Sequence, residues 1–135
     1  MKYLLDTNII SNLLRSRPSP ILIKHLEETS PTDRLICSIT LGELIFGALK
    51  IPEAQKYLVP INELAGNIKI IPFDARAARR YAEIRATLMR QGQSIGDADT
   101  QIASIVLARK YVLVTRNIKH FSRIPGLLLE NWIDE

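Results

Sequence analysis

Short apolar runs that alternate with helix-forming segments constrain the fold of this chain most strongly. Residues 3–5 (YLL), 34–38 (RLICS) and 111–115 (YVLVT) read as strands that are apolar on both faces, and 67–73 and 126–132 each contain a further expected strand. Strands without polar alternation are typical of parallel sheets that helices cover on both sides. The sequence therefore predicts an α/β fold with three α/β/α layers and a central, mostly parallel sheet of about five strands.

Helical periodicity fills the segments between these strands. Asp74 is the expected N-cap of the longest helix, and Gly92 lies just beyond its end. Pro60 is expected to break the helix that contains it. The expected helices cover residues 7–15, 21–28, 39–50, 53–66, 74–92 and 99–110.

Size and composition narrow the class of protein. A chain of 135 residues suits one domain, expected to span 1–135, with a core of its own. Cys37 is the single cysteine, so an internal disulfide and a cysteine-built zinc site are excluded. The net charge of +4 favours an anionic partner. The chain has no apolar run long enough for a membrane span or a signal peptide, so we expect a cytoplasmic protein without membrane association.

Polar residues that can carry chemistry follow the expected strands. Asp6 directly follows the first strand, and Asn117 follows the fourth in the segment VTRN. Glu43 lies on the helix after the second strand, while Asp97 and Asp99 open the helix that leads into the fourth. Ligands of doubly wound sheets bind outside the carboxyl ends of the strands. We therefore expect these distant residues to meet at one edge of the sheet.

Each of these residues also has an ordinary structural explanation. Asp6 can simply cap a helix, and so can one of the pair Asp97 and Asp99. Glu43 can be solvated at a helix edge, and Asn117 is a common turn residue. Convergence favours the functional interpretation, because carboxylates that lie close together repel one another unless a cation sits among them. Ligation by oxygen alone indicates Mg²⁺ or Mn²⁺.

Glu43 is the most informative of these acids. At about 100° per residue it points away from the apolar stripe of its own helix. Ile39 and Phe46 flank it, so we expect its face of the helix to be partly covered as well. A carboxylate in such surroundings is costly unless it is paired, hydrogen-bonded or metal-bound. The apolar stripe consists of Leu41, Leu44, Ile45 and Ala48.

Four segments, taken together and in order, resemble the PIN-domain family. They are LLDTNII, SITLGELIFGA, IGDADTQIAS and LVTRNIKHFSRIPGLLLENW. More closely, the chain is similar to the VapC toxins of bacterial type II toxin–antitoxin modules. The resemblance covers essentially the whole chain and implies a PIN-like fold.

The resemblance also implies an activity, a Mg²⁺- or Mn²⁺-dependent endoribonuclease. The family's catalytic positions fall on Asp6, Glu43, Asp99 and Asn117, with the metal held by Asp6, Asp99 and Glu43. Many relatives carry Asp where this chain has Asn117, which removes one charge, and Asp97 is a candidate to supply it. Glu43 is the preferred residue to orient the attacking water. RNA as substrate, a cognate antitoxin that covers the active site and a homodimer are further implications.

Neighbouring residues carry smaller expectations. The Thr115 hydroxyl is expected to bond a site carboxylate or a water. Arg116 and Lys119 lie beside the expected site and can hold an RNA backbone. We expect structural roles for His25 and His120, with a role as a base as the alternative for His120, which lies near the expected site. Most arginines of the long helix are expected to form a solvated face, and the alternative for some of them is to bind an acidic antitoxin segment.

Three alternatives stay open. A phospho-receiver-like signalling domain needs an acidic pair after the first strand and an acceptor Asp after the third, where this chain has Asp74 opening a helix. A haloacid-dehalogenase-type phosphatase needs Asp-x-Asp after the first strand, where this chain has Asp6-Thr7-Asn8. A catalytically weak or inactive PIN fold would serve as a protein- or RNA-binding module, and Asn117 supports it.

Overall fold

Five short strands form the centre of the molecule. The computed structural model describes residues 1–134. The strand order is β3-β2-β1-β4-β5, and every neighbouring pair is parallel, which confirms the expected class of fold. The strands are β1 (Tyr3–Leu5), β2 (Arg34–Cys37), β3 (Lys69–Ile71), β4 (Val112–Val114) and β5 (Leu128–Glu130).

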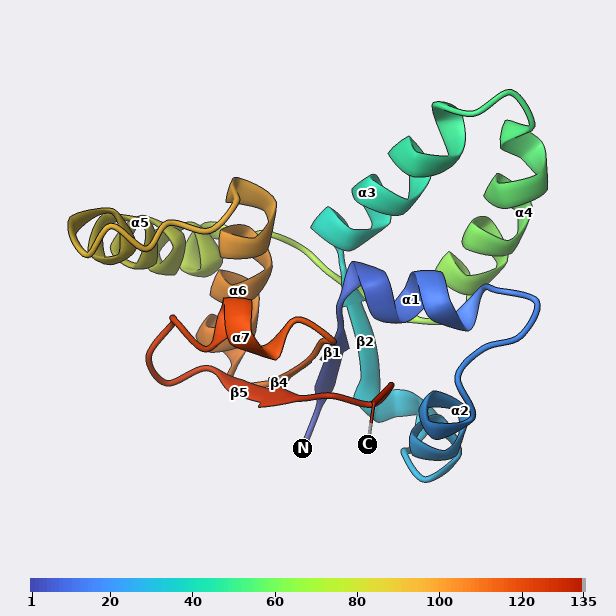
Figure 1. Cartoon of the computed structure of the whole chain (residues 1–135), viewed down its shortest axis with the longest axis horizontal. Helices are drawn as coiled ribbons and strands as arrows, with labels where there is room; N and C mark the ends of the chain where they lie inside the picture. The colour runs from blue at the N-terminus through green and yellow to red at the C-terminus, as the bar shows by residue number, and fades with distance from the viewer. Residues whose placement is uncertain (135) are drawn as a thin grey trace.

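Helices cover both faces of this sheet and complete three layers (Figure 1). One face carries α1 (Thr7–Leu13), α2 (Pro20–Glu27), α3 (Ser38–Leu49) and α4 (Ala54–Ala65). The other face carries α5 (Ala75–Arg90), α6 (Asp97–Arg109) and α7 (Ile118–Phe121). None of the helices within residues 1–134 combines the length and the apolar character needed to cross a membrane.

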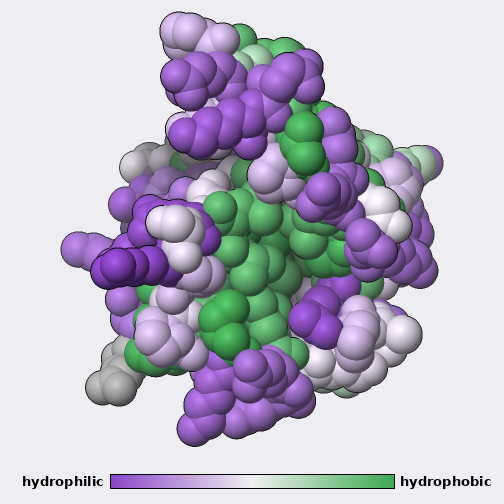
Figure 2. All heavy atoms as spheres, turned by 90° about the vertical axis from the view of Figure 1, so that its right-hand side faces the viewer, coloured by the Kyte–Doolittle hydropathy of each residue, from purple (hydrophilic) through white to green (hydrophobic). Residues whose placement is uncertain are grey.

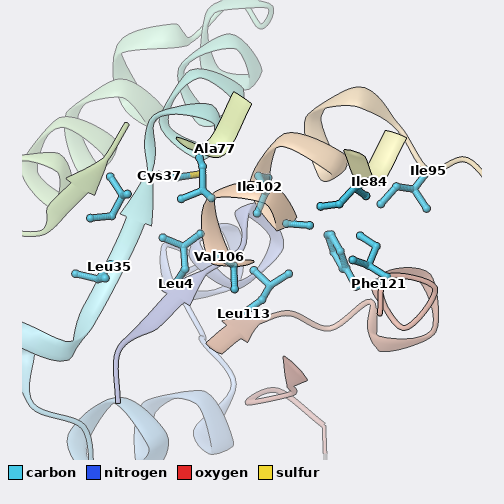
Figure 3. Packing of buried hydrophobic residues seen from close by; sticks show 14 of the residues in the cluster. Leu4, Leu35, Cys37, Ala77, Ile84, Ile95, Ile102, Val106, Leu113 and Phe121 are labelled. Carbon is cyan, nitrogen blue, oxygen red and sulfur yellow. The ribbon is translucent and has the colours of Figure 1, made fainter. Parts of the chain in front are cut away.

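Successive residues of each strand contribute to different cores, because side chains alternate along a strand. Leu4 and Leu35 pack with the core on the α5 and α6 side, where Ile102 also lies (Figure 3). Leu5 and Ile36 pack on the side of α1 to α4. All five side chains are buried, and each contributes about 2 kcal/mol of hydrophobic stabilisation. The apolar character of both strand faces therefore has a direct packing explanation.

The strand order creates a switch point between β1 and β4. From β1 the chain moves outward through β2 to β3, and then returns to the other side of β1 as β4 and β5. Leu5 lies opposite Val114 at the carboxyl ends of the two central strands. The backbone N–H of Asp6 donates to the Val114 carbonyl at 2.9 Å. The residues that follow these strands therefore open into the crevice where doubly wound folds bind ligands.

The boundaries of α4 and α5 test the sequence-based expectations. Asp74 caps α5 as expected, since its side chain accepts from the Ala77 N–H at 3.0 Å, and Gly92 follows the helix with φ +64°. The expected break at Pro60 is wrong, because α4 continues through it from Ala54 to Ala65. Proline removes one helical N–H donor. The carbonyl left without that donor belongs to Lys56, an exposed residue, so water can satisfy it.

The start of α6 differs from the expectation as well. The helix begins at Asp97, and its N-cap is Gly96. The idea that one of the two aspartates caps this helix is therefore wrong. Both Asp97 and Asp99 lie in the first turn, where a carboxylate interacts favourably with the helix dipole. Neither α7 nor the 3-10 turn at Pro31–Asp33 was predicted from the sequence, because each is too short to show a period.

Candidate active site

Asp6 lies at the switch point and is 4% exposed. Its Oδ1 accepts from the Thr7 N–H at 2.8 Å, so it also caps α1, and its Oδ2 accepts from the Thr115 hydroxyl at 2.9 Å. Thr115 Oγ1 in turn accepts from the Asn117 N–H at 3.0 Å. The expectation that Thr115 bonds a site carboxylate is confirmed. These bonds fix the Asp6 carboxylate between the ends of β1 and β4.

Glu43 reaches the same site through Thr7. The Thr7 hydroxyl donates to Glu43 Oε1 at 2.7 Å, and the distance between the Thr7 and Thr40 hydroxyl oxygens is 3.3 Å. Thr7 therefore links two acids, since its N–H bonds Asp6 and its hydroxyl bonds Glu43. Nothing in the sequence pattern identified this role, although a hydroxyl residue directly after Asp6 at a helix start was visible.

The surroundings of Glu43 differ from the expectation. Leu44 and Ala48 of its helix are buried as the stripe predicts, but Glu43 itself is exposed and Phe46 is 66% exposed. The prediction of a partly covered second face is confirmed at its start, where Ile39 packs against the core and Thr40 is buried, and is wrong at Glu43 and Phe46. The reason is that α3 and α4 project together from the sheet, which leaves this side of α3 open (Figure 1).

Asp99 meets a histidine. His120, on α7, places Nε2 3.0 Å from Asp99 Oδ2, and both side chains are partly exposed. The contact agrees with the expectation that His120 lies near the site, and it is compatible with the structural role preferred for this residue and with the base role left open. The one-turn helix α7 brings His120 and Asp99 together. His25 behaves as expected, because its ring stacks on the buried Trp132 with centroids 5.0 Å apart.

Asp97 points away from Asp99. Two residues correspond to about 200° around a helix, so the two side chains leave α6 on opposite sides. Asp97 Oδ1 accepts from the Tyr81 hydroxyl at 3.2 Å and lies 3.8 Å from Arg85 Nη1, both on α5. This placement argues against the suggestion that Asp97 replaces the charge missing at Asn117.

Asn117 and Arg116 complete the edge of the site. Asn117 is exposed and precedes α7, and within residues 1–134 its side chain makes no hydrogen bond. Its contribution to the bonded network is the backbone N–H that Thr115 accepts. Arg116 is exposed and pairs with Asp134 at 3.1 Å, while Lys119 is exposed. Both cations can be reached by a ligand at this edge.

The pKa of Asp6 reflects its burial and the negative charges beside it. The pKa of Asp6 is raised from 3.8 to about 6, mainly by burial and to a smaller extent by the charges of Asp99 and Glu43, while the hydrogen bonds from Thr115 and Thr7 lower it. Asp6, Asp99 and Glu43 are therefore close enough for their charges to interact. A cation placed among them would remove this repulsion.

The donor set fits one kind of metal better than others. Within the described residues, no three His, Cys, Asp or Glu side chains form a ready cage for a metal ion. Mg²⁺ does not require such a cage, because it commonly binds one or two carboxylates and keeps several waters. Asp6 and Asp99, with Glu43 beside them, offer oxygen ligands of this type. The chemistry of the site therefore fits a partly hydrated hard cation.

An apolar groove begins at the site. It has a volume of about 660 Å³ and runs between α1, α3 and α4, with Thr7 and Glu43 among its walls. Figure 2 shows this groove as a hydrophobic hollow surrounded by hydrophilic side chains. Two cations, Arg15 and Lys56, also line it. The main apolar contributors are Leu14, Leu44, Ala48, Ile51, Tyr57 and Ile61.

The parallel sheet and the acids at its switch point define the class of protein. The PIN domain family matches residues 3–127, and the chain belongs to this family. Within it, the chain belongs with the VapC proteins. It is 34% identical over 132 residues to the tRNA(fMet)-specific endonuclease VapC of Shigella flexneri, covering 98% of each chain.

Solved structures support the same assignment. The chain is similar to a chain in the crystal structure of VapBC2 from Rickettsia felis bound to a promoter DNA fragment, with a TM-score of 0.90 and 36% identity over 98% of this chain and 99% of the other. It is also similar to a chain of DNA-bound VapBC from Salmonella typhimurium, with a TM-score of 0.91 and 32% identity over 98% of each. The predicted family and fold are confirmed.

Proposed function

We propose that this protein is a metal-dependent endoribonuclease and the toxin of a VapBC-type toxin–antitoxin pair. The observation that carries the proposal is the buried Asp6, whose pKa is raised by burial and by the charges of Asp99 and Glu43. Without a cation, the burial of the Asp6 charge beside two other acids costs stability that helix capping does not require, so its presence at the switch point indicates a function. The relatives are named as VapC ribonucleases and endonucleases, which supports hydrolysis of RNA.

Asp6 and Asp99 would hold Mg²⁺, or Mn²⁺ in its place, with Glu43 as a further ligand directly or through water. The cation would activate a water for attack on a phosphodiester and stabilise the charge that develops on the phosphate oxygens. Thr115 and Thr7 keep the Asp6 carboxylate in place, because each donates a hydrogen bond to it. His120 contacts Asp99, with Nε2 3.0 Å from Oδ2, and would restrict the position of that carboxylate.

Glu43 has the position expected of a residue that orients the attacking water. One of its oxygens is held by Thr7, and the side chain is exposed at the mouth of the site. Arg116 and Lys119 lie beside Asn117 and would hold the backbone of the RNA. Asn117 offers a neutral carbonyl oxygen at the same edge. No serine or cysteine nucleophile is needed, because water attacks the phosphate directly.

The activity can be tested on the purified chain without its partner. Structured RNA, such as unfractionated tRNA, should be cleaved in the presence of Mg²⁺ and left intact in EDTA. Asp6→Asn and Asp99→Asn should abolish cleavage, while Asp97→Asn should retain it because Asp97 faces α5. Cleavage that persists in EDTA, or in the Asp6→Asn protein, would refute the proposal.

The apolar groove is the proposed docking site of the cognate antitoxin. The solved relatives include toxin–antitoxin complexes. A segment with apolar residues and a few acids would match a groove whose apolar walls carry Arg15 and Lys56. Because Thr7 and Glu43 belong to these walls, a segment seated there would also cover the active site. Substituting Tyr57, which lines the groove and is 46% exposed, with Glu should prevent association with the antitoxin, measured by co-purification, while RNA cleavage continues.

The family resemblance also supports a homodimer as the assembly of the isolated chain. Light scattering coupled to size-exclusion chromatography tests this point directly. A mass close to 31 kDa, about twice the 15.3 kDa of one chain, is expected, and a monomer mass at micromolar concentration would contradict it.

The alternatives do not gain support from the site. Asp74, which a receiver domain would need as its acceptor, instead caps α5 and pairs with Arg109 at 3.0 Å. An inactive binding module gives no reason to keep Asp6 buried beside two other acids. We therefore retain the nuclease as the proposed function.

A further inference from the structure

A second concentration of charge lies outside the active site, between α5 and α6. It surrounds a hollow of about 340 Å³ whose walls include Arg76, Arg79, Arg80 and Lys110. Glu83 is the single acid among the lining residues. Four cations therefore face one anion, and the local potential is positive.

The structure itself satisfies only part of this charge. Arg80 lies 3.9 Å from Glu83, and Arg76 donates to the Ala108 carbonyl at 2.7 Å. Among residues 1–134, neither Arg79 nor Lys110 has a carboxylate within ion-pair distance, and both are exposed. These two cations are free to bind an external anion.

Lys110 occupies a backbone position that does not favour lysine. It ends α6 in the left-handed conformation, with φ 58° and ψ 41°. Glycine or asparagine is the common residue at such a helix end, and other side chains cost about 1 kcal/mol there. The position instead carries a cation that lines the hollow. Lysine at this position therefore lowers the stability of the fold and adds a positive charge to the wall of the hollow.

The hollow is connected to the active site along one pair of helices. α5 lies beside α6, with Arg85 next to Asp97 at the first turn of α6 and Arg76 next to Ala108 at its last turn. From Asp99 to Arg109 the helix rises about 15 Å, slightly more than the length of four stacked nucleotides at about 3.4 Å each, and Asp99 leaves the helix on the side away from α5. A folded RNA that extends past this helix can therefore contact the hollow with one segment and the active site with another, whereas a four-nucleotide RNA cannot.

We infer that Arg79, Lys110 and their neighbours Arg76 and Arg80 form a secondary binding site for the phosphate backbone of the RNA substrate. The inference rests on the proposed nuclease function and extends it. Guanidinium and ammonium groups around a concave surface can bind phosphate, and one guanidinium can donate hydrogen bonds to two phosphate oxygens at once. The site binds without reading bases, so it holds the flank of a folded RNA while another segment enters the active site. Short RNA that cannot reach the hollow gains nothing from it.

Binding and cleavage are measured separately, so that each hypothesis can fail alone. Binding of fluorescent unfractionated tRNA is titrated in EDTA at several salt concentrations, using wild type and the double variant Arg79→Gln, Lys110→Gln. The matched control is Lys24→Gln, Lys69→Gln, which removes the same charge from exposed positions on α2 and β3 outside the hollow. Cleavage of tRNA and of a four-nucleotide RNA is then measured with Mg²⁺.

The hollow variant should bind tRNA about tenfold more weakly, with a salt dependence reduced by about 1 to 2 in the logarithmic slope, while the control stays near wild type. Cleavage of the four-nucleotide RNA should be unchanged. Equal weakening in both variants would overturn the inference, because it would indicate general charge attraction alone. Unchanged tRNA binding combined with lost binding of poly-glutamate would assign the hollow to an acidic protein and also overturn it. If the hollow variant binds tRNA more weakly but the wild-type protein cleaves no RNA, the nuclease proposal alone is refuted.

Discussion

Asp6 and Asp74 occupy similar places in the chain and have opposite electrostatic character. Each follows the end of a parallel strand and caps the next helix with its side chain. Each also accepts a second hydrogen bond, from Thr115 in one case and from Arg109 in the other. Yet the pKa of Asp6 is raised to about 6, while the backbone N–H of Ala77 and the charge of Arg109 lower the pKa of Asp74.

Burial and the sign of the neighbouring charge explain this difference. Asp74 is partly exposed and has Arg109 at 3.0 Å, so its negative charge is balanced by the protein. Asp6 is buried and has Asp99 and Glu43 as its charged neighbours, so its negative charge is not balanced. Helix capping is enough to explain Asp74. Capping does not explain Asp6, because its negative charge is balanced only when a cation binds beside it.

Removing the charge at each position should separate the two aspartates most strongly through activity. Asp6→Asn should lower kcat/KM for RNA cleavage by about 10³-fold, because a ligand of the proposed cation and its electrostatic effect are lost. Asp74→Asn should leave kcat/KM within about twofold of wild type, because Asp74 lies outside the site. Steady-state cleavage assays at saturating Mg²⁺ measure both. Similar losses in the two variants would mean that folding, and not metal chemistry, limits activity.

Asp6→Asn should lower activity but increase the free energy of unfolding of the metal-free protein. The folded state raises the pKa of Asp6, so it binds more protons than the unfolded state between about pH 4 and 6, and the contribution of Asp6 to stability falls as pH rises. A shift from 3.8 to about 6 corresponds to about 3 kcal/mol. In EDTA at pH 7, Asp6→Asn should therefore unfold with a larger free energy than wild type, and the gap should close towards pH 4.

Urea denaturation of both proteins at several pH values measures this difference. Subtracting one curve from the other removes the contributions of the remaining carboxylates, including Asp74, whose lowered pKa stabilises the fold above its own titration range and is lost in acid. A gap that is absent at pH 7, or that widens in acid, would contradict the unbalanced charge assigned to Asp6.

The Thr115 hydroxyl offers a smaller and more local test. Thr115→Val keeps the shape of a fully buried side chain and removes the hydrogen bond that lowers the pKa of Asp6. In metal-free protein the pKa of Asp6 should rise by about one further unit, since a hydrogen bond to a charged group is worth about 1.5 kcal/mol. Carbon-13 NMR of the Asp6 carboxyl group reports the pKa directly. An unchanged titration would mean that Thr115 does not stabilise the ionised form.

The smallest effect on stability is expected at Asp74, whose charge is balanced by Arg109. Asp74→Asn retains a capping side chain and loses only the ion pair with Arg109. The midpoint of thermal unfolding should fall by about 2 °C, because partly exposed ion pairs contribute little. A fall of more than about 10 °C would show that the two aspartates are more alike than their surroundings indicate.

The fold could be predicted from the sequence because the residue patterns that determine it repeat at regular spacing along the chain. Strands such as 112–114 are apolar on both faces, and a sheet buried on both sides requires that pattern. The convergence of Asp6 with Thr115 followed from the rule that parallel strands end at one edge. Such features depend on spacing along the chain, which the sequence displays directly.

The parts that were missed depend on side-chain contacts or on local exceptions. The Thr7–Glu43 bond and the His120–Asp99 contact depend on the relative placement of helices that are distant in sequence. The exposure of Glu43 results from the projection of α3 and α4, which periodicity within α3 does not reveal. The opposite directions of Asp97 and Asp99 were in fact available, since two residues on a helix point to opposite sides.

Calorimetric titration of Mn²⁺ at pH 7 tests most directly whether Asp6 and Asp99 share a divalent cation. Wild type, Asp97→Asn and Asp74→Asn should each bind Mn²⁺ with similar affinity, while Asp6→Asn and Asp99→Asn should bind at least about tenfold more weakly. Equal Mn²⁺ affinity in all five proteins, or no binding to wild type, would contradict the account.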